Sequence, residues 1–249
     1  MYILASNMNA FYGRGYGSGY YMFDWTYLLV LIGLALSLIA SANVKNTFNH
    51  YAKIRSRSNL TGAMAAERVL HRAGIYDVSI QRVAGNLTDH YDPRSKTLRL
   101  SDSTYGTASI AAVCVAAHEC GHAIQDQKQY GPLVLRGTLV PLANFGSSLS
   151  WPVFFAGLIF SIPPLLTAGI ILFSLAVLFQ LVTLPVEFDA SARAVRILGG
   201  TGILNSQELP YTKKVLGAAA LTYVASAAAA ILQLFRIILL FGGRGNDRD

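Results

Sequence analysis

The sequence predicts an α+β, multi-pass helical membrane protein with about four spans and one small mixed unit between the first span and a membrane hairpin. Three observations support this fold class. Of the 249 residues, 53% are hydrophobic and only 13% are charged, whereas soluble domains carry about 25% charged residues. Apolar stretches long enough to cross a bilayer alternate with polar ones. The Lys and Arg residues gather beside these apolar stretches, as they do in membrane proteins.

Residues 1–25 are rich in Gly and Tyr and nearly uncharged, which indicates a flexible or interfacial arm. Residues 26–42 are apolar throughout, near the lower length limit of a spanning helix. A signal peptide is the alternative, because residues 40–42 (Ala-Ser-Ala) resemble a cleavage site. In a signal peptide the positive charge precedes the apolar core, whereas here it follows, from Lys45 onward. We therefore expect an uncleaved anchor with an external N-terminus.

Residues 43–136 differ in kind, because charged residues mix with short apolar stretches. Helical spacing predicts one helix over 59–74 and another over 109–127. Alternation predicts strands over 76–83 and 96–100. We therefore expect a small α+β unit on one side of the membrane.

Residues 137–186 contain no Asp, Glu, Lys, Arg or His. This stretch is too long for one span and long enough for two, so it predicts a transmembrane hairpin. The natural break is Ser161–Pro164, where two prolines follow each other. A hairpin returns the chain to the side that it left, so Glu187 is expected beside the α+β unit.

Residues 187–214 are polar again, and residues 215–241 predict a fourth helix, rich in Ala, Gly and Ser as packing faces in lipid often are. Arg236 complicates this span, because it either snorkels near the outer end or divides the segment into a span and a surface helix. Residues 242–249 form a short tail. The basic loops place the α+β unit on the cytoplasmic side of the cell membrane.

The net charge of +7 does not indicate a nucleic-acid partner, because no nucleic-acid-binding motif accompanies it. The expected partners are the lipid bilayer and a protein or peptide, while the Ala-rich last span also fits membrane-protein partners or a homo-oligomer. Cys114 and Cys120 lie six residues apart on one predicted helix and therefore point in different directions, which argues against a disulfide.

The segment 116–124 (AAHECGHAI) contains the pattern H-E-x-x-H. His118 and His122 lie four apart on the predicted helix, so both imidazoles reach one ion. Glu119 lies beside them, free to act as a general base rather than as a ligand. Imidazoles combined with a carboxylate suit Zn²⁺ and leave a coordination position open for water.

Such a site needs a third protein ligand, and the segment after the hairpin (LPVEFDASARA) offers one. Glu187 is the first charged residue after the uncharged stretch, and a carboxylate at a membrane boundary is costly unless it is paired. Asp189 is the local rival, although charge at a helix N-terminus would also explain it. Glu208 is a more distant candidate. We expect Glu187 to be the ligand.

The run LTDHYDPRSKTLRLS, the segment SIAAVCVAAHECGHAIQ and the segment LPVEFDASARA together resemble the bacterial neutral zinc metallopeptidases of the YugP type. The order of these motifs is also similar to that of membrane gluzincins such as the HtpX and CAAX-prenyl protease families. In those gluzincins an Asp four residues after the glutamate ligand orients a zinc-binding histidine. Here that position is Ser191, whose hydroxyl accepts an imidazole N–H more weakly.

The resulting hypothesis is a zinc metalloendopeptidase that cuts membrane or membrane-proximal proteins, with Glu119 taking the proton of a zinc-activated water. The sequence offers several donors for the oxyanion and does not separate them: His90, Tyr91, Arg193 and Tyr211. A strand at 87–91 or at 96–100 could pair with an extended substrate.

Two other functions compete with this hypothesis. A zinc-binding scaffold subunit of a membrane complex would need no turnover, but it would have no use for Glu119. A transporter would need ionisable residues within its spans, and only Arg236 is present there.

Overall fold

The computed structural model describes residues 24–241. The tail at 242–249 and nearly all of the arm expected over residues 1–25 lie outside the described residues. The fold is mostly helical and carries one small sheet, which confirms the predicted fold class. Its elements run in this order: α2 (Tyr27–Ala52), α3 (Gly62–Arg72), β1 (Ser79–Val83), β2 (His90–Asp92), β3 (Thr97–Ser101), α4 (Asp102–Tyr105), α5 (Ile110–Gln127), α6 (Gly131–Ile159), α7 (Pro163–Gly200) and α8 (Leu209–Phe241).

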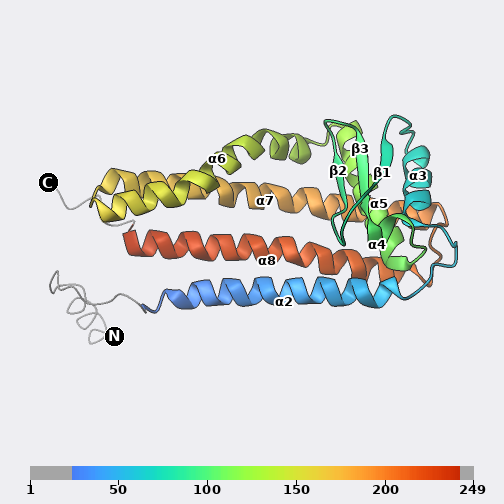
Figure 1. Ribbon diagram of the computed structural model, residues 1–249, viewed down its shortest axis with the longest axis horizontal. Coiled ribbons are helices and arrows are strands. Elements are labelled where there is room, and N and C mark those ends of the chain that lie inside the picture. Colours follow the sequence, from blue (N-terminus) through green and yellow to red (C-terminus); the bar gives the residue numbers. More distant parts are fainter. Residues whose placement is uncertain (1–23, 242–249) are drawn as a thin grey trace.

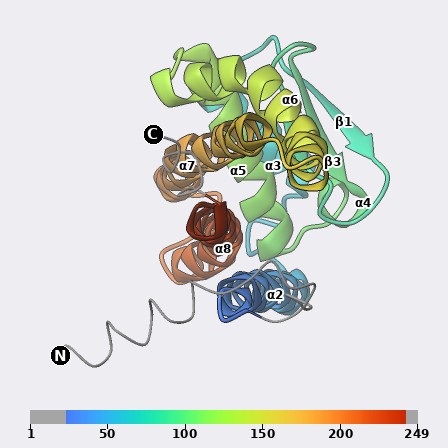
Figure 2. The ribbon, with the colours of Figure 1, turned by 90° about the vertical axis from the view of Figure 1, so that its left-hand side faces the viewer.

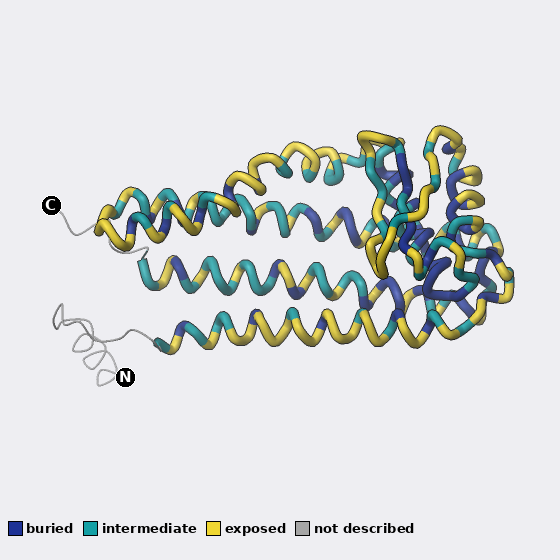
Figure 3. The backbone as a smooth tube through the Cα atoms, viewed as in Figure 1, coloured by how far each residue is buried: buried dark blue, intermediate teal, exposed yellow. Residues whose placement is uncertain are grey.

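Four of the described helices, α2, α6, α7 and α8, are long and apolar enough to cross a membrane. They run along one another as an elongated bundle, and the remaining elements form a globular unit at one end (Figure 1). Viewed from the far end of the bundle, α8 lies between α2 and α7 (Figure 2). Exposed residues continue along α2 (Figure 3), and from Leu28 to Ile39 many of them are large and apolar. Such a surface suits lipid rather than water.

One helix boundary differs from the predicted segments, and one alternative that the sequence left open is decided by the structure. Helix α7 does not end near the membrane boundary but continues through Glu187 to Gly200, with Pro185 in its interior. Helix α8 is likewise one continuous element that includes Arg236. This arginine donates to the Thr26 hydroxyl at 3.1 Å, and its guanidinium lies 4.0 Å from the centre of the Tyr27 ring. A charge held against the start of α2 does not need to divide the helix.

The sheet has the order β1-β3-β2, with β1 parallel and β2 antiparallel to β3. Leu98 and Leu100 on the central strand β3 are fully buried, as expected for a strand with neighbours on both sides. The predicted strands at 76–83 and 96–100 correspond to β1 and β3. The edge strand β2 overlaps the candidate strand at 87–91.

Helix α5 is the centre of the globular unit. Alanines make up much of its surface, and twelve of its 18 residues are buried, so neighbouring elements approach it closely. The main core joins α5 to α3, to the sheet and to the ends of α2, α7 and α8. The globular unit therefore packs directly on the membrane helices, and α5 meets α7 where the candidate site lies.

Candidate metal centre

Two histidines of the H-E-x-x-H pattern lie on one face of α5. The helix begins at a capped end, where the Ser109 hydroxyl accepts a hydrogen bond from the Ala112 N–H at 3.2 Å. His118 and His122 follow one turn apart, with ring centres 4.9 Å from each other. Their side chains point toward α7.

The approach of α7 to α5 is set at Gly121. A Cβ atom at this position would lie 2.6 Å from the carbonyl oxygen of Ala190, closer than any side chain tolerates. The two backbones therefore meet at a glycine, which brings the preceding turn of α7 beside the histidines. On that turn Glu187 is only 2% exposed. Its Oε2 atom lies 3.2 Å from the Nε2 atom of His118 and 3.5 Å from that of His122.

These three side chains each offer one ligand atom, and the three atoms lie within 4.8 Å of one another. Two imidazole nitrogens and a carboxylate oxygen are a donor set that suits zinc and leaves a position open for water. The structure thus brings together His118, His122 and Glu187, although 69 positions separate the first from the last.

The second nitrogen of each ring is held in turn, which orients the first. The Nδ1 atom of His118 lies 3.1 Å from the Ser191 hydroxyl. The Nδ1 atom of His122 lies 3.0 Å from Oε1 of Gln125. Because an amide oxygen only accepts, the His122 proton lies on Nδ1 and leaves Nε2 free as a ligand. Such outer partners fix the ring orientation of metal-binding histidines.

Gln125 is fully buried and links His122 to the rival acid Asp189. Its Nε2 atom donates to Oδ2 of Asp189 at 2.8 Å and to the carbonyl of Val186 at 2.9 Å, which determines how the amide is turned. Asp189 also accepts from Arg193. Asp189 therefore lies behind the histidine and not among the three clustered ligand atoms.

The third acid considered for the metal, Glu208, lies elsewhere in the fold. Its carboxylate accepts hydrogen bonds from the backbone N–H groups of Arg57 and Asn205. This arrangement ties the start of α8 to the loop after α2 and gives Glu208 a structural task.

Glu119 is half-buried and lines the same cavity as His122 and Glu187. Among the described residues its carboxylate has no hydrogen-bond partner, so it is free to act on a molecule in the cavity. Burial lowers the pKa of His122, but hydrogen bonding to Glu187 and the charges of Glu119 and Glu187 outweigh it and raise that pKa above its ordinary value. The cluster therefore favours a cation at this position.

The cavity has a volume of about 450 Å³. Of the donors considered for an oxyanion, His90 and Tyr91 line it, but the Tyr91 hydroxyl donates to Asp126 at 2.9 Å. Burial and this hydrogen bond raise the pKa of Tyr91, so its hydroxyl stays protonated. Arg193 and Tyr211 do not line the cavity.

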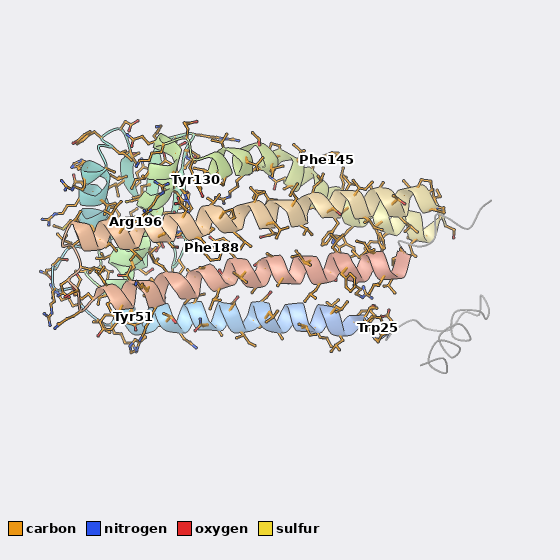
Figure 4. The ribbon with its side chains drawn as sticks, turned by 180° about the vertical axis from the view of Figure 1, so that it is seen from behind. Trp25, Tyr51, Tyr130, Phe145, Phe188 and Arg196 are labelled. Carbon is orange, nitrogen blue, oxygen red and sulfur yellow. The ribbon has the colours of Figure 1, made fainter. Side chains whose placement is uncertain are left out.

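Those last two donors are held elsewhere. Arg193 lies 5.6 Å from the centre of the Tyr130 ring, and Tyr211 packs against Tyr51. Figure 4 shows Tyr130 at the end of the bundle that carries the globular unit.

Among the lining residues that the sequence did not point to, two are polar side chains on membrane helices, Arg136 on α6 and Tyr223 on α8. The Nη1 atom of Arg136 lies 3.7 Å from Oε1 of Glu187. Arg136 is the last charged residue before the uncharged stretch, and Tyr223 is a polar side chain within an apolar span. Polar groups in such positions often mark a functional site, and this signal could have identified both.

The fold and the site together define a metal-dependent hydrolase built into a helical membrane protein. Comparison with known proteins agrees with this class. The family described as "Putative neutral zinc metallopeptidase" matches residues 26–242, and the chain belongs to this family. The chain is 46% identical over 213 residues to "Putative membrane protease YugP" of Bacillus subtilis (strain 168), across 86% of this chain and 95% of that protein. No solved structure matches.

The protein is thus a zinc metallopeptidase with four candidate membrane spans. The resemblance stated from the motifs alone is confirmed, and so are the expected class of enzyme and its metal.

Proposed function

We propose that this protein is an endopeptidase that cuts membrane or membrane-proximal proteins, with His118, His122 and Glu187 holding the catalytic zinc and Glu119 acting as the general base. The observation that carries the proposal is the arrangement of one cavity. Of the three clustered ligand residues, His122 and Glu187 line this cavity, and Glu119 adds a second carboxylate to the same lining.

Zinc at this position supplies Lewis acidity, which lowers the pKa of water and polarises a carbonyl. The residues of the chain do the rest. Glu119 takes a proton from the attacking water, the water oxygen forms a bond to the scissile carbonyl carbon, and the carbon–nitrogen bond then breaks. Glu119 delivers the proton to the leaving amine. Ser191 and Gln125 hold the two imidazoles in place throughout.

The carbonyl oxygen becomes negative during this attack and needs a hydrogen-bond donor besides the metal. Tyr223 is the best-placed candidate, because it lines the cavity and its hydroxyl hydrogen-bonds the carboxylate of Glu187, directly beside the proposed metal position. Among the donors named from the sequence, Tyr91 is held by Asp126 and His90 by the carbonyl of Thr88. We therefore assign this role to Tyr223.

An extended substrate would pair with the edge strand β2. The central strand β3 has β1 on one side and β2 on the other, so the predicted strand at 96–100 has no free edge. By contrast, β2 is at the edge of the sheet, and His90 and Tyr91 on this strand line the cavity. Backbone hydrogen bonds to a free edge are a common way to hold a peptide.

We further propose that the cavity lies on the cytoplasmic side of the cell membrane. Lys53 directly follows α2, and Lys213 and Lys214 lie near the start of α8. Both of these helix ends are at the end of the bundle that bears the globular unit (Figure 1). Reporters fused after Ser58 and after Lys214 should read as cytoplasmic, and one at the N-terminus as external. An external reading after Ser58 would reverse this orientation.

Substitutions at the metal centre test the proposed chemistry. The purified protein should hold about one zinc per chain, and Glu119→Gln should keep this zinc but abolish peptide cleavage. Glu187→Ala should lose the zinc as a histidine variant does. The control, Asp189→Ala, should bind zinc far better than Glu187→Ala because Asp189 acts only through Gln125.

If Asp189→Ala loses the zinc and Glu187→Ala keeps it, the third ligand is misassigned. If Glu119→Gln retains full activity, the general base is another group. A zinc-loaded protein that cleaves nothing would instead indicate the scaffold function.

A further inference from the structure

The cavity at the metal centre has two walls of opposite character. On one side lie residues of the globular unit, among them Asp89, His90, Gln125 and Asp126. On the other side lies the first part of α6. Apart from Arg136, this wall presents no polar side chain, and it consists of Leu133, Val134, Gly137 and Val140.

The first part of α6 is not covered by the rest of the bundle. It diverges from α7 near the globular unit and joins it further along (Figure 1). Pro141 lies within the helix, and prolines are a usual cause of such bends. Within the wall itself, Val134 is 47% exposed. A Cβ atom added at Gly137 would meet no atom within 4 Å. This apolar wall therefore opens to the surroundings of the bundle.

The depth of this wall follows from the rise of α8. We place one membrane boundary at the contact of Arg236 with Tyr27, because cations and aromatic side chains gather at such boundaries. At 1.5 Å per residue, Tyr223 lies roughly 20 Å from that boundary and Lys213 roughly 34 Å. A hydrocarbon core is about 30 Å thick. The cavity therefore lies at the depth of the lipid layer next to the globular unit, and its apolar wall faces lipid.

We propose that this wall of α6 is a binding site for the apolar segment of a membrane-inserted substrate, which enters the cavity from the lipid. The polar flank of the same substrate then extends along β2, and the scissile bond lies between the two. This inference rests on the proposed endopeptidase function and specifies its substrate class. The substrate is a polypeptide whose apolar, membrane-inserted run ends at the cleavage site.

Helix geometry provides a matched pair of variants. Leu133 and Val140 are seven residues apart and share the face that lines the cavity. Leu135 and Leu142 have the same spacing on the same helix but do not line it. The double variant Leu133→Ser/Val140→Ser changes the proposed wall, and Leu135→Ser/Leu142→Ser replaces two apolar side chains elsewhere on the same helix.

The first experiment measures binding without turnover. The full-length Glu119→Gln protein in detergent is titrated with two fluorescent peptides, one with a run of leucines beside a polar flank and one with serines in place of the leucines. We expect the leucine peptide to bind at least ten-fold more tightly. The double variant Leu133→Ser/Val140→Ser should lose about ten-fold of this preference. The double variant Leu135→Ser/Leu142→Ser should keep it. Equal affinity for both peptides, or equal loss in both double variants, would overturn the proposal.

The second experiment uses the zinc-loaded full-length enzyme and a mixed peptide library, and the cleavage products are sequenced. Wild type should select large apolar residues on one side of the cut, and Gly137→Leu should shift this selection to smaller residues because it fills open space next to the wall. If Gly137→Leu selects the same residues as wild type, the proposed apolar binding site is wrong, but the endopeptidase function is not affected. A wild-type enzyme that cuts no peptide contradicts the endopeptidase function, whatever the binding experiment shows.

Discussion

Replacing Gln125 by leucine tests how the outer partners of the metal centre support it. The side chain is fully buried and makes three hydrogen bonds, to His122, to Asp189 and to the backbone of Val186. Leucine has a similar volume but no polar atom. Asp189 would keep its contact with Arg193, whereas the Nδ1–H of His122 would lose its acceptor.

We expect Gln125→Leu mainly to weaken the affinity for zinc. Loss of a hydrogen-bond partner behind a ligating histidine weakens metal affinity by about 10- to 100-fold, which corresponds to about 1.4–2.7 kcal/mol. Gln125→Glu separates the two tasks of the side chain. A carboxylate still accepts from His122, so zinc affinity should stay closer to that of wild type. It also faces Asp189, so the free energy of unfolding should fall.

Competition with a chromogenic chelator measures the zinc affinity of each purified variant, and thermal unfolding of the zinc-free protein measures its stability. Gln127→Leu is the matched control, because Gln127 lies two residues away on the same helix but is exposed. If Gln125→Leu binds zinc as tightly as wild type, Gln125 does not orient His122 and the network has no role at the metal centre.

Three further predictions follow from the site and its surroundings. Tyr223→Phe should lower kcat about 100-fold with little change in KM or zinc content, as loss of an oxyanion donor does. Tyr211→Phe on the same helix should leave kcat unchanged. If both variants lower kcat equally in steady-state kinetics, the assignment of Tyr223 is wrong. Ser191→Ala should weaken zinc binding about ten-fold in the chelator competition, and an unchanged affinity would show that the hydroxyl does not orient its histidine. Burial raises the pKa of Cys114 to about 12 and that of Cys120 well above its ordinary value, so both remain protonated thiols at pH 8. Alkylation of the folded protein should therefore be much slower than alkylation of the denatured protein, and equal rates would contradict the burial of these thiols.

The features that the sequence alone determined are those that depend on neighbouring residues. Apolar length and the position of basic residues are local properties, and they were enough to predict four spans. The pairing of His118 with His122 is also local, because helix geometry places residues four apart on the same face. Glu187 required one further step, the return of the chain through a hairpin without charged residues.

Only the tertiary structure decided which distant groups surround these residues. The buried amide of Gln125, the guanidinium of Arg136 and the hydroxyl of Tyr223 reach the site from three different helices. Their places depend on how α6, α7 and α8 pack, and on the close backbone contact at Gly121. Periodicity shows which face of a helix is apolar but not which other helix covers it, because packing joins residues that are far apart along the chain. The same reason explains why the edge position of β2 and the uncovered apolar wall of α6 became visible only in the folded protein.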